Sequence, residues 1–317
     1  MSKLVVVDEN KEHYGILIYI STLFFFAAME AQAKYLSDNY TVIQIVWARY
    51  TFHFVVITLA LLLLKIFNFR IDFKKPRLLK VQVLRSISLL FMTYFFFASL
   101  SKLPLAEATI ILFASPLITI VLSPWLLKEK VNFSTWLAVI IGFIGMIIVI
   151  NPNSFSEISE IDRSWIVGIA CGILGALFLS LFEIGTRILA PKESTITSLL
   201  FSGAAGLIVT SVLIIINFDP LTGEESWKLP EWDSWVLLVS VGCFGAIGQL
   251  LILWAYAKSK ATTLAPISYC HIIWAVIFGY LIFNSLPDSR SIIGAALIVS
   301  AGMYAYKKIE KNRTIDN

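Results

Sequence analysis

Hydrophobic residues fall into ten long runs along the chain, separated by shorter polar segments. A run of about 20 apolar residues is the length that a helix needs to cross the hydrocarbon core of a bilayer. The pattern therefore predicts ten membrane-spanning helices, at residues 14–35, 41–66, 81–101, 104–126, 133–151, 164–189, 195–217, 234–257, 262–284 and 289–306. The polar segments between them leave no room for a soluble domain. The expected fold class is an all-α integral membrane protein.

Composition supports a membrane protein and excludes several classes. Of the 317 residues, 58% are hydrophobic and 15% are charged, whereas soluble domains have about 45–50% apolar and about a quarter charged residues. A soluble protein and a disordered chain are both excluded. The net charge of +4 is too small to indicate a nucleic-acid partner, so the bilayer is the expected surroundings.

Motifs for catalysis, nucleotide binding and metal binding are missing from the sequence. Cys171, Cys243 and Cys270 lie inside apolar runs, and none has a partner at CxxC spacing. The three histidines have no carboxylate or cysteine at metal-ligand spacing. The chain also lacks the phosphate-binding loop of ATP-driven proteins and the GxSxG and HExxH motifs of hydrolases. We expect no catalytic residues, no metal, no cofactor and no enzymatic activity.

Lysine and arginine are distributed unevenly between the two sides of the predicted bundle. With ten spans, the two termini and alternate loops share one side. That side carries 17 of the 25 Lys and Arg residues, the opposite side carries 4, and 4 lie within spans. Positive residues accumulate in cytoplasmic loops. We therefore expect a multi-pass protein of the cell inner (cytoplasmic) membrane with both termini in the cytoplasm, and an extracytoplasmic linker at 152–163.

The chain also repeats itself. A shift of 156 residues places 106–129 over 262–285 and Ala138 over Gly294. The predicted repeats are 14–151 and 164–306, with five spans each. Because five is odd, the second copy must enter the membrane with the opposite orientation. Inverted repeats are a transporter architecture, in which the substrate binds near the midplane between the halves.

Several short segments resemble the drug/metabolite transporter superfamily, in its ten-helix EamA-domain family. They are Trp47-Ala48-Arg49-Tyr50, Arg85 with Ser88, Leu103 to Ala108, Ser115-Pro116-Leu117, Leu127 to Val131, Trp136 to Gly145, Tyr269, Trp274-Ala275, Gly279-Tyr280, Phe283 and Leu286-Pro287-Asp288. Within the superfamily, the chain most resembles S-adenosylmethionine-type and riboflavin-type carriers. The resemblance implies two EamA domains, a central cavity and alternating access for a small metabolite. The chain departs from the family at Ser285, where members often carry Glu.

Arg49 is the most informative polar residue inside a span. It lies eight residues into the second span, about 12 Å along a helix and close to the midplane. A charge there costs roughly 2.5–3.5 kcal/mol on insertion scales and needs an explanation. His53 lies one turn further on the same face. Arg49 can bind a carboxylate or phosphate with two parallel hydrogen bonds. The alternative is that Arg49 and His53 serve helix packing.

Two further charged residues are candidates for coupling or gating. Glu30 lies at i, i+4 to Lys34 and could pair with it, neutralise Arg49 or bind protons. Arg85, near the predicted cytoplasmic end of the third span, either extends to the membrane surface or forms part of a gate. Pro116 and Pro266 interrupt the fourth and ninth spans, where they could bend the helices as gates.

Aromatic and polar residues inside other spans complete the predicted substrate site. Tyr269 and Trp274 could stack on a planar or cationic ligand, but their angular separation favours only one of them facing a cavity. An intramembrane His or Gln can equally serve as an interhelical hydrogen bond. The candidates for substrate binding are Arg49, Trp47, His53, Tyr94, Gln249, Tyr269, His271 and Trp274.

These observations predict a secondary transporter that moves a small organic metabolite by alternating access. Arg49 favours a zwitterionic or anionic substrate, such as an amino-acid-like or S-adenosylmethionine-like compound. Proton coupling through Glu30 or a histidine is a further hypothesis, and the protein is expected to work as a monomer or homodimer. Two alternatives remain open: an exporter of amines or amino acids, and a membrane-embedded enzyme acting on lipid intermediates.

Overall fold

The structure is a computed structural model of the whole chain. It describes residues 9–67, 76–128, 131–150, 160–190, 192–221, 225–259, 263–264 and 267–315. Pro266 and most of the predicted linker at 152–163 lie outside the described residues.

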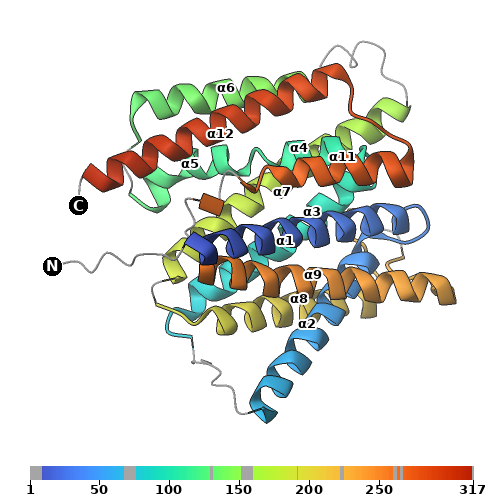
Figure 1. Cartoon of the computed structure of the whole chain (residues 1–317). Helices are drawn as coiled ribbons and strands as arrows, with labels where there is room; N and C mark the ends of the chain where they lie inside the picture. The colour runs from blue at the N-terminus through green and yellow to red at the C-terminus, as the bar shows by residue number, and fades with distance from the viewer. Residues whose placement is uncertain are drawn as a thin grey trace.

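The described chain is helical, and most of its helices run roughly along one direction, whereas α2 runs obliquely to them (Figure 1). They are α1 (Glu9–Leu36), α2 (Val42–Ile66), α3 (Leu79–Leu100), α4 (Leu105–Leu112), α5 (Ser115–Leu126), α6 (Phe133–Ile150), α7 (Glu160–Leu189), α8 (Thr195–Ile215), α9 (Trp232–Lys258), α11 (Cys270–Phe283) and α12 (Ser289–Ile315). Among the described residues, eight segments are long and apolar enough to cross a membrane, with α4 and α5 together forming one of them, and two shorter apolar helices bring the total to ten. The predicted fold class is confirmed.

The fourth span is broken into two helices, as Pro116 predicted. Helix α4 ends at Leu112, and α5 starts at Ser115 with Pro116 in its first turn. Proline has no N–H to continue the hydrogen-bond ladder, and its ring clashes with the preceding turn. The ninth span is also irregular, because α11 begins only at Cys270, after Tyr269. The prediction for Pro266 falls outside the described residues.

The helix contacts have an approximate two-fold symmetry. Helix α1 packs along α9. The counterpart of α1 in the second repeat is α7, and the counterpart of α9 in the first repeat is α3. These two helices also pack along each other. Three pairs join a helix to its own counterpart across the axis: α2 with α8, α4 with α11 and α6 with α12. Two copies of one five-helix unit with opposite orientations produce this pattern. The inverted repeat is therefore present in the packing.

Glycines allow the closest helix crossings. A Cβ built on Gly294 of α12 would lie 2.5 Å from the carbonyl oxygen of Gly145 in α6, and one on Gly145 would lie 2.8 Å from that of Gly294. In the same way, a Cβ on Gly206 of α8 would lie 2.2 Å from the ring of Tyr50. Small residues at crossings let helix backbones approach in membranes. The small-residue motifs therefore serve packing within the chain.

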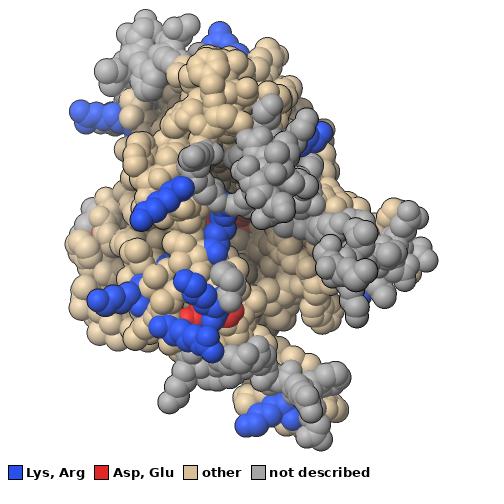
Figure 2. Space-filling model, turned by 90° about the vertical axis from the view of Figure 1, so that its left-hand side faces the viewer, with Lys and Arg blue, Asp and Glu red and all other residues tan. Residues whose placement is uncertain are grey.

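The two ends of the bundle carry different charges. Helix α1 begins and α12 ends at one end, which we call the termini end (Figure 1). Figure 2 looks onto this end and shows Lys and Arg side chains around a hollow. The described residues of that end include Lys65, Arg77, Lys80, Lys128, Lys192, Lys258 and Lys307. The opposite end, the far end, holds most of the described carboxylates: Asp38, Glu107, Asp219, Glu225, Glu231, Asp233 and Asp288.

Candidate functional site

A small internal cavity lies where α2, α3, α7, α8 and α9 meet. Its volume is about 20 Å³, enough for about one water molecule. We call it the arginine cavity, and it is lined by Arg49, Tyr50, His53, Arg85, Leu89, Phe182, Leu199, Ser202, Gly203 and Gln249. The structure thus brings together four residues that the sequence singled out: Arg49, His53, Arg85 and Gln249.

Arg49 is hydrogen-bonded to a neighbouring side chain, but one of its N–H donors has no partner among the described residues. It is 6% exposed, and its Nη1 donates to the Thr93 hydroxyl at 3.0 Å. Its guanidinium lies over the ring of Tyr50, 4.9 Å from the centroid. Its Nε is buried and has no hydrogen-bond partner among the described residues. A buried donor without a partner costs free energy, so this guanidinium keeps a donor available for a further acceptor.

Arg85 reaches the cavity from α3. Its Nε donates to the Thr186 hydroxyl at 2.7 Å, and its Nη1 donates to the Ser202 hydroxyl at 3.0 Å. The guanidinium also lies 4.4 Å from the centroid of the Phe182 ring. The head group is therefore held between α7 and α8 inside the bundle, and it does not extend to the membrane surface.

The charged side chains of the cavity lining are basic, with no carboxylate among the described lining residues. Arg49 and Arg85 both line it, and His53 lies beside them with 7% exposure. Among the described residues that line it there is no aspartate or glutamate. Two guanidinium groups facing one space without a carboxylate repel each other, and an anion between them relieves this repulsion. The arrangement can bind a carboxylate or phosphate group.

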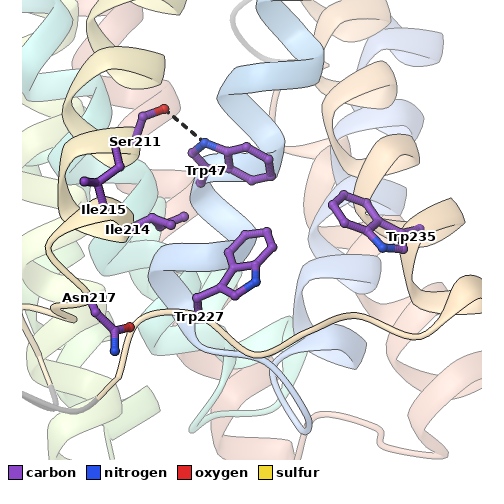
Figure 3. Close-up of a pocket in the computed structure, with 7 residues that line it drawn as sticks. All are labelled: Trp47, Ser211, Ile214, Ile215, Asn217, Trp227 and Trp235. Carbon is purple, nitrogen blue, oxygen red and sulfur yellow. Dashed lines mark hydrogen bonds between the residues drawn. The ribbon is translucent and has the colours of Figure 1, made fainter.

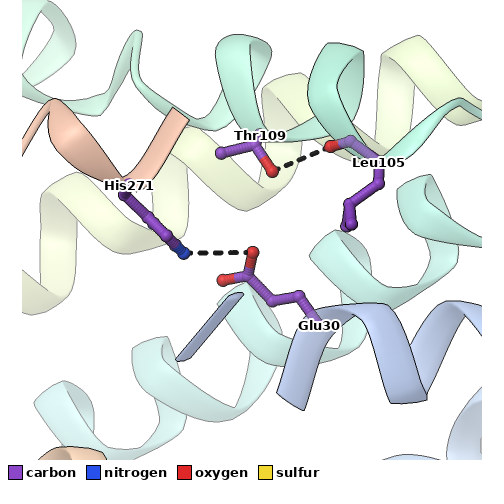
Figure 4. Close-up of polar contacts among 4 residues, drawn as sticks. All are labelled: Glu30, Leu105, Thr109 and His271. Carbon is purple, nitrogen blue, oxygen red and sulfur yellow. Dashed lines mark hydrogen bonds and ion pairs between the residues drawn. The ribbon is translucent and has the colours of Figure 1, made fainter. Parts of the chain in front are cut away.

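A second polar cluster joins α1 to α11 (Figure 4). Glu30 Oε2 lies 3.3 Å from His271 Nε2, and the two residues are 4% and 7% exposed. The nearby Thr109 hydroxyl donates to the Leu105 carbonyl at 2.8 Å. Neither Glu30 Oε2 nor His271 Nε2 has a well-aligned hydrogen-bond partner among the described residues. The two atoms lie close together, and no other hydrogen bond to them is present among the described residues.

Lys34 does not pair with Glu30, so that alternative is wrong. Its Nζ donates to the carbonyl oxygens of Leu100 and Leu103 at 2.9 and 2.7 Å. These carbonyls lie at the end of α3, where helical partners run out. Lys34 therefore caps the C-terminal end of α3. Glu30 contacts His271 and not Lys34.

The breaks in the fourth and ninth spans contact each other. Phe113, at the break between α4 and α5, packs against Tyr269 with ring centroids 5.3 Å apart and against His271 at 6.0 Å. Phe113 and Tyr269 are 156 residues apart, the shift that superimposes the repeats. They are therefore symmetry-related residues that touch at the axis. Phe113 was not among the predicted site residues, although the repeat shift relates it to Tyr269, which was.

Three further predicted site residues lie outside both the arginine cavity and the Glu30–His271 pair. Tyr94 donates to the buried carboxylate of Asp219 at 2.5 Å, which fastens the segment before α9 over α3. Trp274 packs against Phe24 and Phe278, with ring centroids at 5.1 and 6.5 Å. Trp47 lines a different pocket at the far end, described below. None of the three lines the arginine cavity.

That second pocket, the tryptophan pocket, has a volume of about 710 Å³ (Figure 3). Its described lining residues are Trp47, Ser211, Ile214, Ile215, Asn217, Trp227 and Trp235. The three indoles come from α2, from the segment before α9 and from the first turn of α9. Trp47 was predicted to bind the substrate, whereas Trp227 and Trp235 were not among the predicted site residues.

Comparisons with known proteins agree with this architecture. A crystal structure that is 17% identical matches 93% of this chain and 98% of its own with a TM-score of 0.62, which shows the fold. A protein of Rickettsia bellii named as an S-adenosylmethionine uptake transporter is 27% identical over 92% of both chains. A protein of Vibrio cholerae named as a riboflavin transporter is 29% identical over 62% of this chain and 60% of its own.

The family comparison covers nearly the whole chain. The model of the EamA-like transporter family matches twice, at residues 13–151 and 160–305. These two matches contain the arginine cavity, the Glu30–His271 pair and the two broken spans. The resemblance seen in the sequence is confirmed. The chain belongs to the EamA-like transporter family and is a multi-pass membrane transporter, not an enzyme.

Proposed function

We propose that this protein moves a small anionic or zwitterionic metabolite across the cytoplasmic membrane, and that the arginine cavity binds the negative group of the substrate. The observation that carries the proposal is the convergence of Arg49 and Arg85 on one buried space with no carboxylate among its described lining residues. The unpartnered Nε of Arg49 supports it, because a substrate oxygen would supply the missing acceptor.

Transport in this proposal requires the two repeats, 14–151 and 164–306, to move against each other. The arginine cavity holds about 20 Å³, far less than the roughly 300 Å³ or more of a metabolite site. This conformation is therefore closed around the site. Transporters of inverted repeats open by rocking of one repeat against the other around a central site. Contact between Phe113 and Tyr269 at the two helix breaks supplies a central pivot.

The orientation that we propose places both termini in the cytoplasm. It rests on the 17 to 4 distribution of Lys and Arg, and the alternation of loops between the two ends of the bundle supports it. The relatives named for S-adenosylmethionine and riboflavin support a metabolite as cargo. Because these two names differ in substrate, they favour a class of cargo and not one compound.

An amine exporter, the alternative from the sequence, would need a carboxylate to receive the cation. Glu30 lies 3.3 Å from His271 Nε2, and Glu183 accepts a hydrogen bond from Thr119 at 2.9 Å. Neither glutamate lines the arginine cavity. The geometry therefore favours the anion.

A binding panel tests the proposal. The purified protein in detergent is heated with amino acids, S-adenosylmethionine, nucleosides, flavins, organic phosphates and amines. A ligand at 100 times its Kd stabilises the folded state by about 2.7 kcal/mol. We expect the stabilising compounds to carry a carboxylate or phosphate and to lose their effect in Arg49→Met. A stabilising amine whose effect survives in Arg49→Met would contradict the proposal.

The Glu30–His271 pair supports proton coupling as part of this function. Both groups are buried, they lie 3.3 Å apart, and Lys34 is engaged at the end of α3. Ionisable residues buried within membrane spans mark ion and proton pathways in transporters. We expect transport by the wild-type protein in vesicles to respond to a pH gradient.

In Glu30→Gln, whose side chain does not titrate, we expect transport to become indifferent to the gradient and to a protonophore. Glu231→Gln is the matched control, because Glu231 is exposed at the far end and its variant should respond as the wild-type protein does. Transport by the wild-type protein that ignores the gradient would contradict the coupling and leave the anion site untouched.

A further inference from the structure

The tryptophan pocket at the far end has the form of a binding site. Trp47 and Trp227 meet nearly at right angles, with ring centroids 5.3 Å apart and an interplanar angle of 88°. Trp227 and Trp235 lie 6.3 Å apart at 53°. Neither pair is stacked, and Figure 3 shows the three indoles among the residues that line the pocket.

The walls of the pocket are fixed by hydrogen bonds to α2 and α8. Trp47 Nε1 donates to the Ser211 hydroxyl at 3.0 Å. The side chain of Gln44 donates to the Lys228 carbonyl at 2.8 Å and accepts from the Lys228 N–H at 3.0 Å. The Thr41 hydroxyl also donates to the Ser226 carbonyl at 2.7 Å. The residues immediately before and after Trp227 are therefore both hydrogen-bonded to side chains at the start of α2. A site built this way is organised before its ligand arrives.

The side-chain acceptor oxygens of the pocket already take part in hydrogen bonds. Apart from the indoles, the described lining residues that carry polar side chains are Ser211 and Asn217. Ser211 Oγ accepts from Trp47, and Asn217 Oδ1 accepts from the Ser226 N–H at 2.9 Å. A primary ammonium group has three N–H donors to satisfy, and this pocket gives it little to bind. A cation without N–H donors does not need hydrogen-bond acceptors, so their shortage does not weaken its binding.

Charge around the pocket favours a cation. The described residues of the segment before α9 and of its first turn include Glu225, Glu231 and Asp233, all exposed, against the single cation Lys228. Carboxylates at a rim raise the local concentration of cations. The faces of indole rings are also negative, and cages of aromatic rings are the usual recognition site for quaternary ammonium groups.

We propose that the tryptophan pocket binds an onium group, a quaternary ammonium or a sulfonium, through the faces of Trp47, Trp227 and Trp235. The source is a free onium solute or the choline headgroup of a lipid, since both present the same chemistry. The site is separate from the arginine cavity, because the two share no lining residue. This inference therefore does not rest on the proposed function.

Binding of radiolabelled choline to the full-length protein tests the site, in a detergent that contains no choline group. We expect saturable binding that tetramethylammonium and trimethylsulfonium displace and that ammonium does not. Trp227→Leu should weaken choline binding by about tenfold or more, and Trp227→Phe, which keeps an aromatic face, should retain most of it. Arg49→Met should bind choline as the wild-type protein does.

Trp232 supplies the matched control. It lies at the same end and is 88% exposed, but it does not line the pocket. Trp232→Leu should bind choline normally. If Trp232→Leu weakens binding as much as Trp227→Leu does, or if the wild-type protein shows no saturable binding, these tryptophans serve only to anchor the protein at the membrane interface, and the proposal is wrong.

Nanodiscs distinguish the two sources of the onium group. Saturable choline binding in phosphatidylglycerol nanodiscs that disappears in phosphatidylcholine nanodiscs identifies the lipid headgroup as the occupant. Equal binding in both identifies a free solute. Either result supports the site, whereas absence of binding in phosphatidylglycerol nanodiscs contradicts it.

Discussion

Replacing Arg49 with methionine is expected to lower transport of the anionic substrate by roughly 100-fold, because hydrogen bonds to charged groups contribute about 1.5–3 kcal/mol. Methionine carries no charge and matches the aliphatic stem of arginine, so the change removes the guanidinium and keeps the space of the stem filled. The measurement is uptake into vesicles that contain equal amounts of each protein.

The structure indicates that this variant stays folded. No carboxylate is among the described residues of the cavity, so removal of the arginine leaves no buried anion without a partner. The Thr93 hydroxyl, which accepts from Arg49, still donates to the Leu89 carbonyl at 2.9 Å and still lies 3.1 Å from the Tyr50 hydroxyl. Removal of one of two neighbouring cations also reduces their repulsion. We expect a thermal unfolding midpoint close to that of the wild-type protein.

Two further variants sharpen this prediction. Arg49→Lys keeps the charge but loses the two-pronged geometry of the guanidinium, so its transport should lie between those of the wild-type protein and Arg49→Met. Arg290→Met removes an exposed arginine at the far end and should transport normally. If Arg49→Met transports at the wild-type rate, Arg49 serves helix packing and the arginine cavity is not the substrate site.

Adding a single methyl group at Gly294 is expected to destabilise the protein strongly. In Gly294→Ala, the new Cβ would lie 2.5 Å from the Gly145 carbonyl oxygen and 2.4 Å from Val149 Cγ2. The carbonyl belongs to the backbone of α6 and cannot rotate away, so α6 and α12 must separate. Overpacking of this kind typically costs about 1–3 kcal/mol. The readout is a lower thermal unfolding midpoint in detergent.

Gly175→Ala is the matched control for this prediction. A Cβ on Gly175 of α7 meets its nearest atom, the Phe96 backbone nitrogen, at 3.4 Å, which is ordinary contact. Alanine is also the better helix former by about 0.8–1 kcal/mol. We therefore expect Gly175→Ala to be neutral or stabilising. Equal effects of the two alanines would show that the α6–α12 crossing does not limit stability.

The sequence by itself determined the features that depend on neighbours along the chain. Hydrophobic run lengths gave the ten spans, because the bilayer sets the length of a crossing helix. Pro116 predicted the break between α4 and α5, since proline interrupts the hydrogen bonds of its own helix. Arg49 and His53 share a face because a helix turns every 3.6 residues, and both line the same cavity.

Only the tertiary structure decided which side chains meet across helices. Glu30 contacts His271, 241 residues away, in place of Lys34 one turn along its own helix. Arg85 reaches Ser202 on α8, and Tyr94 binds Asp219 and so lies outside the arginine cavity. These contacts depend on the rotation and crossing of whole helices, which are set by how closely backbones approach at glycines such as Gly145 and Gly294. A hydrophobic pattern specifies that a helix is buried in lipid or protein, but the packing of all the helices together selects its partners.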